Sequence, residues 1–367
     1  MILENIEILN FKNIENTSIE FSEGVNCLLG MNGMGKSNLL DAIHLLSMAR
    51  TMNSSSDSNL IRHGQDLMLV KGVFRTESDT RDTISCGMAK GKRKSLKRNS
   101  KEYKKFSDHI GNYPVVTATP EDSKIVVGGG DERRKLIDMV ISQANPAYLS
   151  ALIRYTKGLE NRNKMLRAGI QDAILYETIE NMMAESAAVL YQERNIWVTQ
   201  ISPFVTEIYN RISGGREEIT LNYRSQLSGT DMHSLLNSRR AKDQILGFSS
   251  AGPHRDDMEI FLDGYPIRNL GSQGQLKTFA VSLRLAIFRY LKEIKKMTPL
   301  LLLDDIFDKL DVQRVENIMN EVTTGESFGQ IFITDTNRKH LDDILSGISG
   351  ARSLIKVSEG VFSSVKI

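Results

Sequence analysis

A glycine-rich loop is the feature that most constrains the fold of this chain. The loop reads Gly30-Met31-Asn32-Gly33-Met34-Gly35-Lys36-Ser37 and fits the pattern G-x-x-x-x-G-K-[ST]. It follows an apolar stretch at residues 25–29, which predicts a short buried strand, and precedes a helical pattern from residue 36 to about 49. Glycines let successive backbone N–H groups point inward, and the helix N-terminus adds a positive dipole end. The sequence therefore predicts a phosphate-binding loop in an α/β fold.

The loop residues have separate expected roles. We expect Lys36 to neutralise the β- and γ-phosphates of a nucleotide and the hydroxyl of Ser37 to bind Mg²⁺. The backbone of the preceding residues would surround the phosphates, and these residues are Gly30, Met31, Asn32, Gly33, Met34 and Gly35. The alternative is a loop that is merely rich in glycine. Such a loop would not need a strand directly before it and a helix directly after it, and both are predicted here.

A second motif, which is acidic, supplies the other half of the expected phosphoryl-transfer site. Four leucines precede two acids in Leu300-Leu301-Leu302-Leu303-Asp304-Asp305, which predicts a buried strand that ends in carboxylates. We expect Asp304 to hold Mg²⁺ through water and Asp305 to polarise the attacking water. The two motifs are about 270 residues apart, which is too far for a small GTPase or a simple kinase.

The segment before the leucine run suggests the class of nucleotide site. Residues 269–275 read Asn-Leu-Gly-Ser-Gln-Gly-Gln and open a long amphipathic helix predicted at about 274–296. They resemble the L-S-G-G-Q signature of ABC-type ATPases. That resemblance implies that Ser272 closes in trans on the γ-phosphate of ATP in a partner subunit. The simpler reading is that Ser272 is only a helix N-cap. Residues 308–311 stand in the place of the D-loop of that superfamily.

Charge is distributed unevenly along the chain. The formal net charge is +2, but residues 90–105 hold nine basic residues and one acid. This concentration suggests a polyanion partner, and a solvated flexible hairpin is the alternative. We expect DNA contacts from Lys92, Arg93, Lys94, Lys97, Arg98, Lys101, Lys104 and Lys105.

Periodicity indicates an inserted helical arm. Residues 131–168 and 171–213 are long helical stretches, with Pro146 and Pro203 as the expected kinks. We therefore predict an α/β fold with an ABC-type (P-loop) ATPase head, a mixed sheet and an inserted helical lobe. The expected domains are a head part at 1–125, a helical lobe at 126–245 and a second head part at 246–367.

The whole chain resembles the RecF family of DNA replication and repair proteins. The resemblance rests on the glycine loop with the helix after it, and on further segments that follow in the family's order. These segments are Leu60-Ile61-Arg62-His63-Gly64, Thr119-Pro120-Glu121-Asp122, Glu132-Arg133-Arg134-Lys135-Leu136-Ile137-Asp138 and Ala251-Gly252-Pro253-His254-Arg255-Asp256-Asp257.

The resemblance implies a set of functions. The family implies a weak, slow, DNA-stimulated ATPase that acts mainly as a switch and forms an ATP-dependent homodimer on duplex DNA and single-strand/duplex junctions. It also implies cooperation with RecO and RecR in recombinase loading, and a role in the SOS response. Lys12, expected near the nucleotide, replaces the usual Arg of the family and loses its planar fork. Asp335 stands where transporter ATPases place a switch His.

Other classes of protein fit less well. An ABC transporter subunit is disfavoured by the missing switch His, the helical arm and the basic segment. A nuclease fusion would need a further acidic cluster. Another SMC-like DNA-associated ATPase, or a passive ATP-gated DNA clamp, stays open. No apolar run approaches 18 residues, and two cysteines provide neither a disulfide framework nor a four-ligand zinc site. We expect a soluble, cytoplasmic protein that does not bind membranes.

Overall fold

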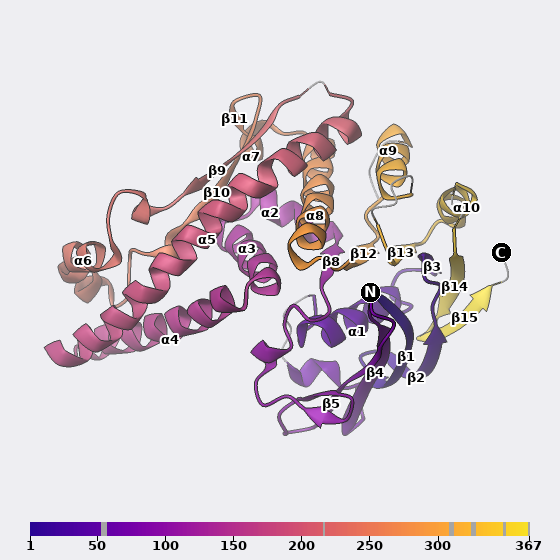
Figure 1. Ribbon diagram of the computed structural model, residues 1–367, viewed down its shortest axis with the longest axis horizontal. Helices are drawn as coiled ribbons and strands as arrows, with labels where there is room; N and C mark the ends of the chain where they lie inside the picture. Colours follow the sequence, from indigo (N-terminus) through magenta and orange to yellow (C-terminus); the bar gives the residue numbers. More distant parts are fainter. Residues whose placement is uncertain (53–56, 216, 308–311, 324–327, 348–349, 366–367) are drawn as a thin grey trace. The chain divides into compact units, whose positions relative to one another are not determined.

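The chain divides into two compact units. The computed structural model describes residues 1–52, 57–215, 217–307, 312–323, 328–347 and 350–365 (Figure 1). The first unit comprises Met1–Asp122 and Val281–Ile367, and the second comprises Ser123–Ala280. Among the described residues, no helix combines the length and the apolar character that crossing a membrane requires.

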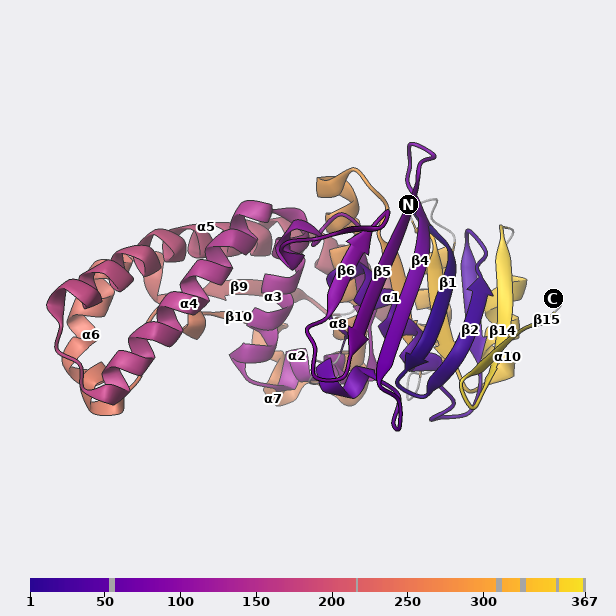
Figure 2. The ribbon, with the colours of Figure 1, turned by 90° about the horizontal axis from the view of Figure 1, so that it is seen from below.

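The first unit contains an antiparallel sheet of six strands, visible side by side in Figure 2. Apolar residues alternate with polar ones along β1 and β4, so that Ile6, Ile8 and Val70 are buried on one face while Glu7 and Leu69 are exposed on the other. The strand order is β2-β1-β4-β5-β6-β7, with β1 Ile2–Phe11, β2 Ile14–Glu20, β4 Leu67–Arg75, β5 Arg81–Ala89, β6 Ser95–Arg98 and β7 Lys101–Glu102.

The second sheet of this unit is mixed. Five of its strands are parallel and short, and β15 pairs antiparallel with β14 at one edge. Its order is β15-β14-β3-β13-β12-β8, with β3 Val25–Leu29, β8 Val115–Ala118, β12 Leu300–Asp304, β13 Ile331–Asp335, β14 Arg352–Ser358 and β15 Val361–Val365. The N-terminal strand β3 lies between two C-terminal strands, so both ends of the chain build one core.

Helix α1 (Lys36–Met48) packs between the two sheets. It contacts β1, β4 and β5 on one side and β8, β12 and β13 on the other. A helix covered on both sides must be apolar around most of its surface, and Leu39, Leu40, Ile43 and Leu46 are all fully buried. The sheets are also linked by Gln330, whose buried amide exchanges two hydrogen bonds with the backbone of Leu3.

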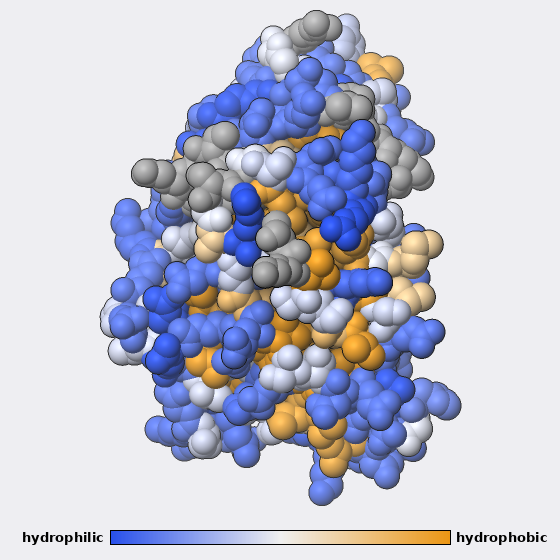
Figure 3. Space-filling model, turned by 90° about the vertical axis from the view of Figure 1, so that its right-hand side faces the viewer, coloured by the Kyte–Doolittle hydropathy of each residue, from blue (hydrophilic) through white to orange (hydrophobic). Residues whose placement is uncertain are grey.

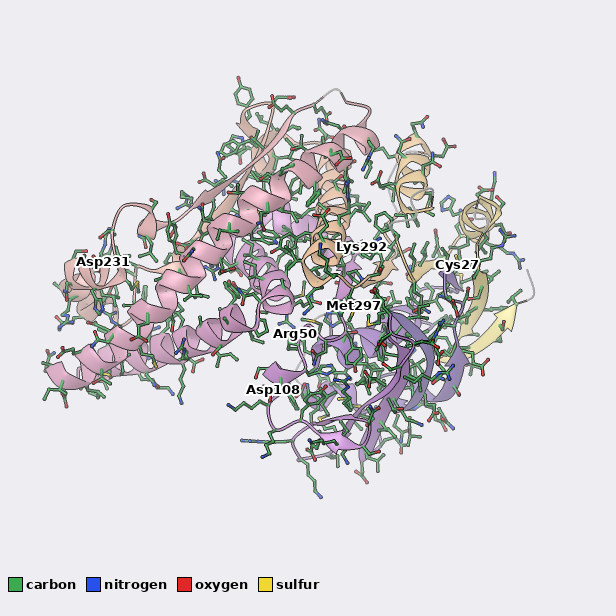
Figure 4. All side chains as sticks on the ribbon, viewed as in Figure 1. Cys27, Arg50, Asp108, Asp231, Lys292 and Met297 are labelled. Carbon is green, nitrogen blue, oxygen red and sulfur yellow. The ribbon has the colours of Figure 1, made fainter. Side chains whose placement is uncertain are left out.

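Further helices complete the first unit. These are α9 (Val312–Thr323), α10 (Arg338–Ser346) and the later part of α8 (Gln273–Lys295). Figure 3 shows a face on which hydrophobic residues lie among predominantly hydrophilic ones. Cys27, labelled on β3 in Figure 4, and Cys86 are both buried free thiols.

The second unit is built mainly from helices, which range from 4 to 41 residues in length. They are α2 (Ser123–Val127), α3 (Gly130–Ala144), α4 (Pro146–Ala168), α5 (Ala173–Ser213), α6 (Met232–Leu246) and α7 (Ile267–Leu270). Pro146 begins α4 instead of kinking one helix, because Asn145 caps the N-terminus through its side-chain oxygen. Pro203 lies inside α5, whose 41 residues reach about 60 Å.

A small three-stranded sheet brings residues beyond 246 into the second unit. Strand β9 (Ile219–Arg224) pairs antiparallel with β10 (Asp257–Leu262), and β10 pairs with β11 (Tyr265–Pro266). Residues 246–280, which the sequence analysis assigned to the C-terminal head part, therefore pack with the helical unit in space. The pairing of β9 with β10 is the physical reason for this difference.

The segment Ala251–Asp257 joins the helices of this unit. Gly252 has a φ of +126°, and a Cβ there would lie 2.6 Å from the hydroxyl of Tyr155. The same hydroxyl contacts His254 Nδ1 at 2.7 Å. Arg133 donates two hydrogen bonds to Asp257. These contacts give the family-like segment a structural role.

Candidate functional site

The glycine loop connects β3 to α1 as predicted. Gly33 and Gly35 have φ values of +80° and +112°, which lie in the left-handed region that favours glycine. At Gly30 a Cβ would lie only 2.4 Å from the carbonyl oxygen of Val357 in β14. The first glycine is therefore required by close packing against the neighbouring strand, whereas the other two are required by their backbone conformation.

Contacts from distant segments fix the shape of the loop. Asn13 donates from Nδ2 to the carbonyl of Gly33 at 3.3 Å and accepts from Asn38 of α1 at 2.7 Å. On another side, the backbone N–H of Gly360, in the turn between β14 and β15, donates to the carbonyl of Met34 at 2.8 Å. Asn13 and Gly360 could not be predicted as loop contacts, because nothing in the sequence near either residue indicates a contact with the loop.

Lys36 lies folded over the loop. Its Nζ donates to the carbonyls of Gly30 at 2.6 Å and Met31 at 3.1 Å. Burial lowers the pKa of Lys36, and the negative charges of Asp305, Asp304 and Asp335 act in the opposite direction. The three carboxylates therefore favour the charged form of the lysine, so the site combines one cation with nearby negative charge.

Ser37 and Asp304, the two residues expected to bind Mg²⁺, are in direct contact. The hydroxyl of Ser37 donates to Asp304 Oδ1 at 2.9 Å. Strands β3, β13 and β12 are parallel neighbours, so their carboxyl ends lie along one edge of the sheet and bring these residues together. A hydroxyl and a carboxylate are hard oxygen ligands of the kind that Mg²⁺ prefers. The donor set present at this edge therefore fits the ion.

Thr334 connects the two acids at the end of β12. Its hydroxyl donates to Asp304 Oδ1 at 2.7 Å and accepts from the backbone N–H of Asp305 at 2.9 Å. Burial raises the pKa of Asp304, while the two hydroxyl donors lower it. Asp305 has a φ of +49°, so the chain turns sharply directly after the strand. Thr334 is a further residue that the sequence analysis missed.

The structure places Lys12 beside α1. Its Nζ forms an ion pair with Asp41, a residue one turn beyond Ser37. Asp41 also accepts from the backbone N–H of Met52 at 2.8 Å. Lys12 is thus paired with a carboxylate of the helix that follows the glycine loop.

Asp335 occupies the position at which transporter ATPases place a histidine. It is buried at the end of β13, and its carbonyl accepts from the backbone N–H of Gly30 at 3.4 Å. Its carboxylate accepts from Asn337 N at 2.8 Å and lies 3.3 Å from Nδ1 of His340. A histidine does therefore approach this position, but it comes from α10.

Ser272 lies at the start of α8, in the second unit. Its hydroxyl accepts from the backbone N–H of Gln275 at 3.3 Å, and its own N–H donates to Gln275 Oε1 at 2.6 Å. This reciprocal pair is a capping box. Gln275 also donates to Glu217 at 2.7 Å. Ser272 therefore acts as the N-cap of α8. This role does not conflict with the expected contact of Ser272 with the γ-phosphate of a partner subunit's ATP.

The basic segment forms the edge of the antiparallel sheet. Lys94 is turned inward, with a side chain only 6% exposed and an ion pair to Asp57. Arg98 is paired with the buried Asp82 at 2.8 Å. The other exposed or half-exposed members are Lys90, Lys92, Arg93, Lys97, Lys101, Lys104 and Lys105, and the paired Arg98 is also exposed.

Two further predictions concern acidic residues. The D-loop prediction at residues 308–311 lies outside the described residues. Within the described part of the chain, no group of three or more His, Cys, Asp or Glu side chains could hold a metal ion. Asp122, in the Thr119–Asp122 segment that resembles the RecF family, is buried and accepts two hydrogen bonds from Arg284 of α8.

Two sheets around a buried helix, a glycine loop and an acidic strand end define a nucleotide-binding head of the ABC and SMC type. Comparisons identify the family. The RecF/RecN/SMC N-terminal domain model matches residues 2–115. The DNA replication and repair protein RecF of Porphyromonas gingivalis is 46% identical over 361 residues, covering 98% of this chain and 99% of that protein. That of Bacteroides thetaiotaomicron is 44% identical over 366 residues, covering 100% and 99%. The chain belongs to the RecF family, as predicted.

Solved structures agree with this assignment. The recombination mediator protein RecF with ATP, of the RecFOR pathway, has a TM-score of 0.88 and 30% identity, with 100% of this chain and 98% of that chain covered. An Smc head bound to the C-terminal winged-helix domain of ScpA has a TM-score of 0.60 and 21% identity, covering 100% and 98%, and shows the shared fold alone. The predicted fold class is confirmed.

Proposed function

We propose that this chain is an ATP-binding protein of recombinational DNA repair and replication-gap repair. The observation that carries the proposal is the convergence of Lys36, Ser37 and Asp304 at one edge of the mixed sheet. RecF proteins of known structure hold ATP, which supports a nucleotide in the same loop of this chain.

Different groups of the loop bind different parts of the nucleotide and its metal ion. Backbone N–H groups from Gly30 to Gly35 cradle the phosphates, and Lys36 exchanges its carbonyl partners for the β- and γ-phosphates. Ser37 and Asp304 hold Mg²⁺, with Thr334 orienting Asp304. When bound, the ion neutralises phosphate charge and orients the γ-phosphate.

Hydrolysis requires a positioned water and a closed site. Asp305 polarises the water, and Ser272 of a second copy closes over the γ-phosphate, so hydrolysis occurs in an ATP-dependent homodimer. Glu is the other carboxylate side chain that could act as this base. Asp305 is one methylene shorter, and misplacement of the water by about 1 Å costs on the order of a hundredfold in rate. We therefore expect slow turnover, so that ATP acts as a switch.

DNA is the proposed partner of the dimer. The exposed basic side chains of the β6–β7 edge contact the phosphate backbone of duplex DNA or of a single-strand/duplex junction. Cooperation with RecO and RecR and support of the SOS response follow from family membership. A passive ATP-gated DNA clamp is the second candidate, because Asp305 is a shorter base than Glu.

One measurement separates these functions. Steady-state ATPase activity should be slow, rise more steeply than linearly with protein concentration and increase with duplex DNA. A rate strictly proportional to concentration would contradict catalysis in trans. Binding of ATP and DNA with no hydrolysis at any concentration would favour the passive clamp.

A further inference from the structure

Large apolar side chains are exposed at the end of the helical unit where α4 turns into α5 and α6 ends. Ile174 is 78% exposed and Ile245 is 87% exposed, although isoleucine is among the most often buried residue types. We call the group the arm-tip patch. It comprises Ile170, Ile174 and Leu175, where α4 turns into α5, and Ile245, Leu246 and Phe248 at the end of α6. Gathered apolar exposure of this kind marks an interaction site.

The two halves of the patch are neighbours. Gln244 of α6 donates to Oε1 of Gln171, in the α4–α5 turn, at 3.5 Å. The guanidinium of Arg240 lies 5.5 Å from the ring centroid of Tyr176 in α5. Figures 1 and 2 both show α6 beside the end at which α4 and α5 meet. The six side chains therefore form one surface.

A buried ionic cluster makes this surface rigid. Arg162 of α4 is fully buried, and it donates to Glu180 of α5 at 2.9 Å and to Asp243 of α6 at 2.7 Å. It also donates to the hydroxyl of Ser249 at 2.8 Å. A buried ion pair is a poor source of stability compared with apolar packing, but it specifies one geometry. The arm tip is thus held as a preformed platform.

The rim of the patch is basic. Four basic side chains lie on the helices that carry it, and none has an acidic partner among the described residues: Lys164 and Arg167 in the last turns of α4, and Arg239 and Lys242 in the second half of α6. Arg255 lies 5.5 Å from the ring centroid of Phe248. Two exposed acids also lie near the patch on this stretch of chain. Asp172 is engaged at 3.0 Å with the backbone N–H of Leu175 as the N-cap of α5, and Glu177 lies one turn after Ile174, so the four basic side chains outnumber them.

We propose that the arm-tip patch is a docking surface for an acidic, amphipathic segment of another protein. The apolar face of such a segment covers the six exposed side chains, and its carboxylates pair with the four basic side chains at the rim. Affinity then comes from apolar burial, whereas orientation and choice of partner come from charge.

Other occupants fit this surface less well. A second copy of the chain, docked through the same patch, would bring basic rim against basic rim. A DNA backbone would pair with the rim but leave six apolar side chains against phosphates. A lipid surface would receive the apolar side chains but would desolvate the Gln171–Gln244 amide pair in their midst.

Two synthetic helical peptides test the proposal with the full-length protein. Both carry the same leucine face, and their polar faces carry either glutamates or lysines. In fluorescence anisotropy, the acidic peptide should bind at least about tenfold more tightly than the basic one. The double variant Ile174→Glu/Ile245→Glu should lose about tenfold or more of that affinity. The control Ile153→Glu changes a 51% exposed isoleucine of α4 outside the patch and should bind like the unmodified protein.

Reversal of the rim tests the charge argument separately. Lys164→Glu/Lys242→Glu should invert the preference between the two peptides. The proposal is overturned if neither peptide binds, if both bind equally, or if the Ile153 variant loses affinity equally. It is also overturned if the Ile174/Ile245 variant instead loses self-association, duplex DNA binding or flotation with phosphatidylglycerol vesicles, because each loss assigns the patch to a different occupant.

Discussion

At the residue scale, Asp304 illustrates how a binding site opposes stability. Burial raises the pKa of its carboxyl group above the ordinary value. The folded protein therefore holds this proton more tightly than the unfolded chain does. Stability is highest below the unfolded pKa, falls as the pH rises toward the folded pKa, and stays reduced above it. At neutral pH the buried charge is thus a net cost despite the two hydroxyl donors and Lys36, and a bound cation would offset it.

Replacement of Asp304 should separate these two effects. In Asp304→Asn the amide oxygen still accepts from Ser37 and Thr334, but the buried charge is gone. We expect the melting temperature without ligand at pH 8 to rise by about 2–4 °C for each kcal/mol of relieved penalty, and the further rise caused by ATP with Mg²⁺ to disappear. Thermal unfolding with and without Mg-ATP measures both, with the exposed Asp66→Asn as control. A lower melting temperature together with a retained ligand shift would refute the assignment.

Lys36 should affect nucleotide binding much more than folding. Lys36→Met keeps most of the aliphatic stem but removes the ammonium. Charge-assisted hydrogen bonds contribute about 1.5–3 kcal/mol, so ATP affinity should fall by roughly tenfold to a hundredfold. ATP-dependent dimers should also disappear in light scattering, with the melting temperature little changed. The exposed control Lys71→Met, which removes only a surface ion pair with Glu7, should bind ATP normally.

At the scale of elements, the start of α8 combines two roles that substitutions can separate. Ser272→Asp keeps a good N-cap but places a negative charge where the partner's γ-phosphate would lie. Ser272→Arg removes the cap and adds bulk. Both variants should bind ATP as monomers nearly normally and fail to form ATP-dependent dimers in sedimentation. If Ser272→Asp dimerised normally, Ser272 would be a cap alone.

The β6–β7 edge should contribute non-specific affinity for DNA. Lys101→Gln/Lys104→Gln removes two exposed charges without touching the Lys94–Asp57 or Arg98–Asp82 ion pairs. The slope of log affinity against log salt on duplex DNA should flatten by about 0.9 for each DNA phosphate that the protein no longer neutralises. The matched pair Arg154→Gln/Lys157→Gln on α4 should leave the slope unchanged. An unaltered slope in the first variant would show that the basic segment is a solvated sheet edge that does not contact DNA.

At the scale of the whole molecule, the proposed switch predicts a trapped state. Asp305→Asn removes the base but leaves the cradle and Asp304 in place, so ATP-bound dimers should accumulate on duplex DNA. Their dissociation after dilution should be slower than that of the unmodified protein, as measured by light scattering or by retention on immobilised DNA. Equal lifetimes would show that hydrolysis does not time release.

The sequence by itself determined the glycine loop, the acidic strand, the long helices and the family. Each of these features is a contiguous run whose spacing carries its own chemistry, and α8 at Gln273–Lys295 lies within one residue of its predicted bounds. The break at Asn145–Pro146 was visible as a proline but not as a new helix, because a proline can either kink a helix or begin one.

Only the tertiary structure decided which distant residues share an environment. Three contacts join segments that are far apart in the sequence: Asn13 with the glycine loop, Thr334 with Asp304 and Asp305, and strand β9 with strand β10. It also showed Lys94 turned inward and the apolar side chains at the arm tip turned outward. Local patterns fix the type of element, because they act through backbone geometry and periodicity. Contacts between distant residues depend on how the elements pack, and no short stretch of sequence encodes that packing.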